Sequence, residues 1–73
     1  MGYTLTARLM ERTCLKPLQL TLWEGSRLVT QSYCAGTVSA GREHVEDMAK
    51  RYQLDAAELI NQIHAQLPKL PPY

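Results

Sequence analysis

Apolar residues alternate with polar ones near the start of the chain. This period of two predicts a half-buried strand over residues 3–9, whose inward positions would be Tyr3, Leu5, Ala7 and Leu9. The alternation stops at Met10, so the strand is expected to end there. Pro17 belongs to the connection that follows, because proline cannot donate to a ladder.

Two further strands are predicted, over about residues 18–23 and 27–34. Gly25 and Ser26 lie between them and suit a two-residue type II′ hairpin turn, because glycine accepts a positive φ at the first central position. The turn predicts a register in which Gln31 faces Leu20, a polar mismatch on the apolar face. Its other pairs are Glu24 with Arg27, Trp23 with Leu28, Leu22 with Val29, Thr21 with Thr30, and Leu18 with Tyr33.

In this register the two faces of the sheet differ in character. One face is apolar and is expected to lie beneath the helices; it collects Leu18, Leu20, Leu22, Val29 and Tyr33. The opposite face is expected to stay open, since a helical layer can cover only one side of a three-stranded sheet. It carries Trp23, Leu28, Thr21 and Thr30.

The second half of the chain has helical periodicity. Residues 35–41 are small and predict a connector, and a helix is expected from about Arg42 to Gln53 on an apolar stripe of Val45, Met48, Ala49 and Tyr52. Asp55 and Glu58 resemble a capping box for a second helix, which Pro68 is expected to stop. Its inward positions would be Ala56, Leu59, Ile60, Ile63 and Leu67.

These elements predict one α+β domain over residues 1–73, in the order βββαα. A three-stranded antiparallel meander (1–35) is followed by a helix pair (42–67), packed on one face of the sheet, and a proline-rich tail (68–73). A chain of 73 residues buries only roughly 60% of its unfolded surface, so a large catalytic cleft is not expected.

Composition and charge exclude several function classes. The net charge of +1 does not make the strongly basic surface expected of a dedicated nucleic-acid binder. The chain has no apolar run near 18 residues, so no membrane-spanning helix is expected. Residues 1–12 lack the continuous apolar stretch of a secretory signal, so the expected location is the cytoplasm.

No motif in the chain predicts a cofactor, a metal or catalysis. Two cysteines and two histidines have the right count for zinc but no close pair that would form half a site: Cys14, Cys34, His44 and His64. The two cysteines would lie on the outer strands, too far apart for a disulfide. Phosphate-binding glycine loops and the common hydrolase signatures are missing, so the chain is not expected to be an enzyme.

Residues 48–63 resemble the helix-turn-helix of small DNA-binding regulators. Ala49 takes the crossing position of the two helices and Leu54 lies in the turn. The resemblance implies a transcriptional regulator whose second helix reads DNA. That helix offers no arginine or lysine, the residues on which base and phosphate contacts depend; it offers Asp55, Glu58, Asn61, Gln62 and His64. DNA binding is therefore the alternative interpretation.

The favoured interpretation is a non-catalytic module that binds a protein through the open sheet face. Tryptophan and arginine are enriched at binding hot spots, and the predicted contact residues are Trp23, Leu28, Arg8, Arg12, Thr21 and Thr30. The partner would be another protein or a second copy; nucleic acid is a weaker option because one aromatic makes a poor stacking platform. Alternatively, the tail or the connector folds over Trp23 as a small second core.

Small size without catalytic motifs suits an accessory or inhibitor protein, such as those carried by phages and mobile elements. In size and element order the chain is similar to some small anti-CRISPR proteins.

Overall fold

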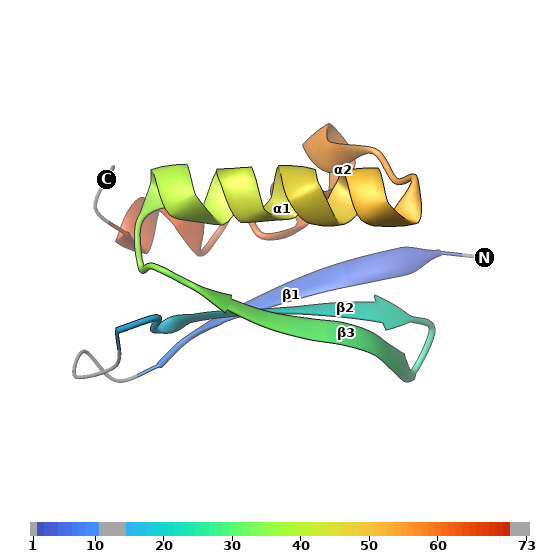
Figure 1. Cartoon of the computed structure of the whole chain (residues 1–73), viewed down its shortest axis with the longest axis horizontal. Coiled ribbons are helices and arrows are strands. Elements are labelled where there is room, and N and C mark those ends of the chain that lie inside the picture. The colour runs from blue at the N-terminus through green and yellow to red at the C-terminus, as the bar shows by residue number, and fades with distance from the viewer. Residues whose placement is uncertain (1, 11–14, 71–73) are drawn as a thin grey trace.

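The protein folds as a three-stranded antiparallel sheet followed by two α-helices and a short 3₁₀ helix, as a computed structural model shows (Figure 1). The elements are β1 (Tyr3–Leu9), β2 (Leu18–Glu24), β3 (Arg27–Cys34), α1 (Val38–Tyr52), α2 (Ala56–Gln62) and η1 (Leu67–Lys69). The structure describes residues 2–10 and 15–70. The predicted fold class, α+β with the order βββαα, is confirmed.

The strands lie in the order β1-β2-β3, and the helices lie along one face of the sheet, so the opposite face is uncovered (Figure 1). The apolar residues of β2 form the floor of the core, and Leu20 and Leu22 have no exposed surface. The other buried apolar residues come from every helix and strand and from the positions just after α2 and η1: Leu5, Leu18, Cys34, Val45, Met48, Ala49, Leu59, Ile63, Leu67 and Leu70.

The hairpin between β2 and β3 has the predicted turn. Gly25 has a φ of +63°, and Ser26 is not among the residues with a positive φ, which is the type II′ pattern. Arg27 donates to the Glu24 carboxylate across the turn. Trp23 pairs with Leu28, as predicted.

Beyond Leu28 the predicted register is wrong, because β3 contains a β-bulge. The register shifts between Leu22 and Trp23, and Val29 is the extra residue on β3. From there each β3 residue faces one position further along β2 than predicted: Leu22 pairs with Thr30, Thr21 with Gln31, Leu20 with Ser32, Gln19 with Tyr33, and Leu18 with Cys34. Gln31 and Tyr33 therefore lie on the open face, and Thr30 lies on the helix side.

Helix α1 begins four residues earlier than predicted. Thr37 caps it, because its Oγ1 accepts a hydrogen bond from the Ala40 N–H at 3.1 Å. Residues 38–41, which were predicted to belong to the connector, therefore form the first turn of the helix. Gly41 is buried within that turn, where a Cβ would come within 3.1 Å of the Leu18 side chain, so glycine lets the helix approach the sheet closely.

Helix α2 is shorter than predicted and does not end at Pro68. It stops at Gln62, and the chain continues through a turn into η1, which has Pro68 in its first turn. Ile63 and Leu67 lie beyond the end of the helix but are still buried. This is why the apolar spacing in the sequence continues to Leu67. Leu70 is also buried, so the first part of the predicted tail contributes to the core.

The turn between the helices depends on a residue in the left-handed conformation. Gln53 has φ 57° and ψ 48°, and its N–H donates to the carbonyls that end α1. The next residue, Leu54, donates its N–H to the Ala49 carbonyl at 2.8 Å. A glycine adopts this conformation without the Cβ clash that other residues meet.

Within residues 2–10 and 15–70, the helices are too short and too polar for any of them to cross a membrane.

We expect Gln53→Gly to raise the free energy of unfolding by about 1 kcal/mol, because glycine removes the strain of the left-handed C-cap. Urea denaturation monitored by circular dichroism measures the change. Gln53→Ala is the matched control and should give no gain, since alanine keeps the Cβ. Equal stability of the glycine and alanine variants would contradict the strain argument.

We expect Thr37→Ala to lower the free energy of unfolding by about 1 kcal/mol, because the Ala40 N–H loses its capping acceptor. Thr37→Ser keeps the hydroxyl and should stay close to the wild type. The same urea titration tests both variants, and an unchanged midpoint for Thr37→Ala would show that the cap does not stabilise α1.

Candidate functional site

The uncovered face of the sheet presents nine side chains in three rows that cross the strands. We call this surface the open face. At the hairpin end, Thr4, Trp23 and Leu28 form one row. Thr6, Thr21 and Gln31 form the middle row, and Arg8, Gln19 and Tyr33 form the row at the far end.

Most polar side chains of the open face, though not Thr4 or Arg8, are hydrogen-bonded within it. The Trp23 Nε1 donates to Thr6 Oγ1 at 3.0 Å, which ties the indole to the middle row. Gln31 Nε2 donates to Thr21 Oγ1 at 3.2 Å. Gln19 Nε2 donates to the Tyr33 hydroxyl at 3.0 Å. That hydroxyl in turn donates to Gln31 Oε1 at 3.4 Å. These bonds join all three rows and hold the long side chains in place.

Apolar surface is exposed at the two ends of this face. Leu28 is 48% exposed beside the half-buried Trp23, and Tyr33 is 45% exposed at the far end. The middle row between them is polar. Thr21 is almost fully buried in it; its hydroxyl accepts from Gln31 Nε2 and its backbone carbonyl accepts from Thr6 Oγ1. The described side chains of the open face include one cation, Arg8, and no carboxylate.

Four of the six predicted contact residues lie on the open face, namely Trp23, Leu28, Arg8 and Thr21. The predicted place of Thr30 on the open face is wrong, because the bulge pairs it with Leu22 on the helix side, where it is half-buried. Arg12 lies outside the described residues. The connector residues that form the start of α1, and η1, lie on the helix side and do not cover Trp23 (Figure 1); residues 71–73 of the predicted tail lie outside the described residues.

Five residues of this surface were not among the predicted contact residues: Thr4, Thr6, Gln19, Gln31 and Tyr33. A signal for two of them was present, because the regular register placed Gln31 against Leu20. Burying an amide there without a partner costs several kcal/mol, whereas a one-residue bulge moves it to the open side. The same shift carries Tyr33 outward and places Cys34 beside Leu18.

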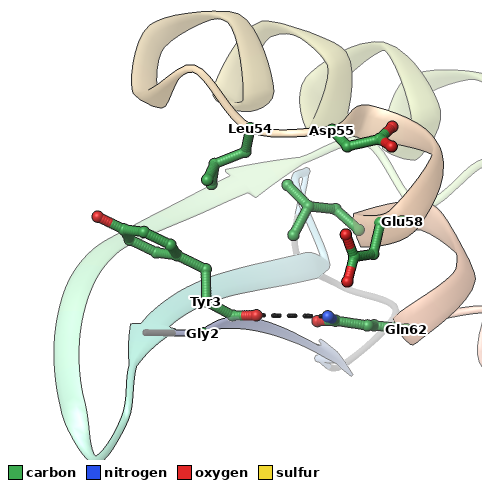
Figure 2. Close-up of a pocket in the computed structure, with 7 residues that line it drawn as sticks. Gly2, Tyr3, Leu54, Asp55, Glu58 and Gln62 are labelled. Atoms are coloured by element: carbon green, nitrogen blue, oxygen red, sulfur yellow. Dashed lines mark hydrogen bonds between the residues drawn. The ribbon is translucent and has the colours of Figure 1, made fainter.

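A second feature lies along the outer edge of β1. The Leu5 N–H donates to Gln62 Oε1 at 2.6 Å, and Gln62 Nε2 donates to the Tyr3 carbonyl at 3.3 Å; Figure 2 shows the second of these bonds. A pocket of about 200 Å³ surrounds this contact, lined by Gly2, Tyr3, Leu54, Asp55, Glu58, Leu59 and Gln62. A pocket of about 230 Å³ lies at the other end of β1, lined by Ala7, Leu9, Leu18, Gln66, Lys69 and Leu70.

Cys34 is a poor nucleophile in this fold. Burial raises the pKa of its thiol above the ordinary value, and the nearby Lys16 opposes the effect only in part. Among the described residues, no three histidine, cysteine, aspartate or glutamate side chains lie close enough together to hold a metal ion.

Comparison of the chain with models of known families, with curated proteins and with solved structures found no match.

Proposed function

We propose that this chain is a non-catalytic module that binds another protein through the open face. The observation that carries the proposal is the cross-strand pair of Trp23 and Leu28 on a face that the helices leave uncovered. Tyr33 adds a second aromatic at the other end of the same face. Tryptophan, tyrosine and arginine are enriched at binding hot spots.

The chemistry of the open face favours a foreign protein over a second copy. Two identical faces packed together would bury Arg8 with no carboxylate on the copy to pair with it, and with only two small apolar areas to offset the desolvation. A partner that brings acceptors or a carboxylate opposite Arg8 avoids that cost. The open face therefore fits a partner surface with two apolar areas, a polar strip between them and a carboxylate opposite Arg8.

Rigidity supports binding in place of catalysis. Six side chains of the open face are hydrogen-bonded within it, namely Thr6, Gln19, Thr21, Trp23, Gln31 and Tyr33, and these bonds form no nucleophile–base pair. A surface held in this way loses little side-chain entropy when it docks. Such a module can act as an accessory or inhibitor protein by occupying part of its partner.

The alternative, a regulator that reads DNA with α2, receives less support from the geometry. Helix α2 has seven residues, and its side chain Gln62 bonds to β1. Its exposed polar positions include Glu58 and Asn61, while residues 53–68 contain no arginine or lysine. Phosphate contacts need those cations.

We expect Leu28→Asp to weaken capture of the partner at least about tenfold, because a charge replaces an apolar contact at the Trp23 end of the open face. The assay uses the tagged chain as bait in extracts of the producing cells, with bound proteins quantified by mass spectrometry. Leu15→Asp is the matched control, since Leu15 is 96% exposed in the loop before β2 and lies off the open face.

Arg8→Ala and Arg42→Ala form a second matched pair, because Arg8 is exposed on the open face and Arg42 is exposed on α1. We expect only Arg8→Ala to reduce capture. Equal capture by Leu28→Asp, Arg8→Ala and the two controls, with all four variants folded by circular dichroism, would show that the open face is not the site.

The DNA alternative is tested by titrating labelled duplex DNA at low salt and again at physiological salt. Because the described surface of α2 lacks cations, we expect no saturable binding at either salt concentration. Saturable binding that weakens steeply with salt and is lost on Asn61→Ala would favour the regulator instead.

A further inference from the structure

Gln62 takes the place of a neighbouring strand at the outer edge of β1. Its side-chain amide accepts from the Leu5 N–H and donates to the Tyr3 carbonyl, which are the two groups that flank Thr4 on that edge. A residue of an added parallel strand would pair with the same two groups through its own N–H and C=O. The amide in Figure 2 therefore satisfies a strand-pairing position with a side chain.

The rest of the β1 edge continues the same pattern. Backbone groups alternate in direction along a strand, so the Ala7 and Leu9 groups point to the same outer side as those of Leu5. Consistent with this, the Met10 N–H points the other way and donates to the Pro17 carbonyl. Among residues 2–10 and 15–70, Gln62 is the only partner outside the sheet that bonds to the backbone of β1.

The two pockets lie along this edge, one at each end of β1 and both on the helix side. Tyr3 lines the first pocket, and Ala7 and Leu9 line the second. Side chains on one face of an extended segment repeat every two residues, and residues four apart lie about 13 Å from each other. A strand added beside β1 would therefore place one side chain at each pocket.

The linings of the pockets differ in charge. Asp55 and Glu58 line the first pocket, and of these Asp55 also caps α2 through the Ala57 N–H. The second pocket is lined mainly by apolar side chains, with Lys69 at its side. Together they complement a basic side chain at the Tyr3 end of β1 and an apolar one at the Leu9 end.

We propose that the β1 edge is a docking site for an extended segment of a partner protein, with a basic and an apolar side chain four residues apart. The segment adds as a fourth strand and replaces the Gln62 amide at the Tyr3 and Leu5 groups. A second copy of this chain fits less well, because the helix-side residues of its own β1 include no basic side chain: Tyr3, Leu5, Ala7 and Leu9. The site is separate from the open face.

The test is an NMR titration of the ¹⁵N-labelled full chain with short synthetic peptides. The probe is acetyl-Lys-Thr-Val-Thr-Leu-Thr-amide, whose Lys, Val and Leu share one face; its reversed sequence is also used, because a strand can add in either direction. We expect millimolar peptide to shift the amide signals of Leu5, Ala7 and Leu9. Gln62→Ala should bind roughly threefold to tenfold more tightly, because the peptide no longer has to replace two hydrogen bonds.

Two variants test the two halves of the proposal. Ala7→Pro removes an outward N–H from the edge and should abolish the shifts. Glu58→Lys should weaken binding of the lysine peptide and strengthen binding of a peptide with glutamate in its place; this charge exchange remains informative if the proline variant does not fold.

The proposal is overturned if neither peptide shifts Leu5, Ala7 or Leu9 in Gln62→Ala at millimolar concentration. Shifts confined to Trp23, Gln31 and Tyr33 would also overturn it, since they place the peptide on the open face. Because these signals come from different residues, failure at the β1 edge is distinguishable from failure of the open face as a protein-binding site.

Discussion

The arrangement of this fold depends on where the Gln31 amide can lie. A regular hairpin would place it against Leu20, which has no exposed surface, and no partner on that side is available to an amide in an apolar core. The bulge at Val29 moves Gln31 to the other side, where it bonds to Thr21 and Tyr33. One extra residue thus keeps the Gln31 amide out of the core, where the smaller Thr30 and Ser32 take the helix-side positions, and builds a hydrogen-bonded network on the open face.

The helical layer depends on the floor of the core. With Ser32 and Cys34 beside the leucines of β2, the helix side of β3 carries small side chains, whereas the regular register would have put Tyr33 there. Gly41 also lets α1 approach the sheet closely, because its missing Cβ leaves room for the Leu18 side chain. The left-handed Gln53 reverses the chain so that α2 returns to β1, and this return brings Gln62 to the sheet edge. The docking site proposed at the β1 edge therefore depends on the turn between the helices.

Local patterns were sufficient to predict the fold class, the three strands and the type II′ turn. Each follows from residues close together in the chain: alternation in the strands, and Gly25 with Ser26 in the turn. The start of α1 was missed because Ala35–Gly41 has the composition of a connector, and only the contact of Gly41 with Leu18 explains a glycine within the helix. The end of α2 was missed because Ile63 and Leu67 continue the apolar spacing after the helix stops.

The candidate sites were predicted only in part for a related reason. Trp23 and Leu28 are adjacent to the turn, so their pairing follows from it directly. Tyr33 and Thr30 lie beyond the bulge, and a shift of one residue sends each to the opposite face. Gln62 bonds to Leu5 and Tyr3, from which it is separated by 57 and 59 positions in the chain, and no local pattern encodes such contacts.

The polar character of the open face also affects which contacts it can make. A three-stranded sheet that left a continuous apolar face in water would associate without specificity. Here the middle row of Thr6, Thr21 and Gln31 separates the apolar ends, and its bonds fix the side chains that surround them. A partner that binds there, as proposed, would have to match two apolar positions and the polar row between them. The network that follows from the placement of Gln31 would thus add selectivity to the proposed binding face.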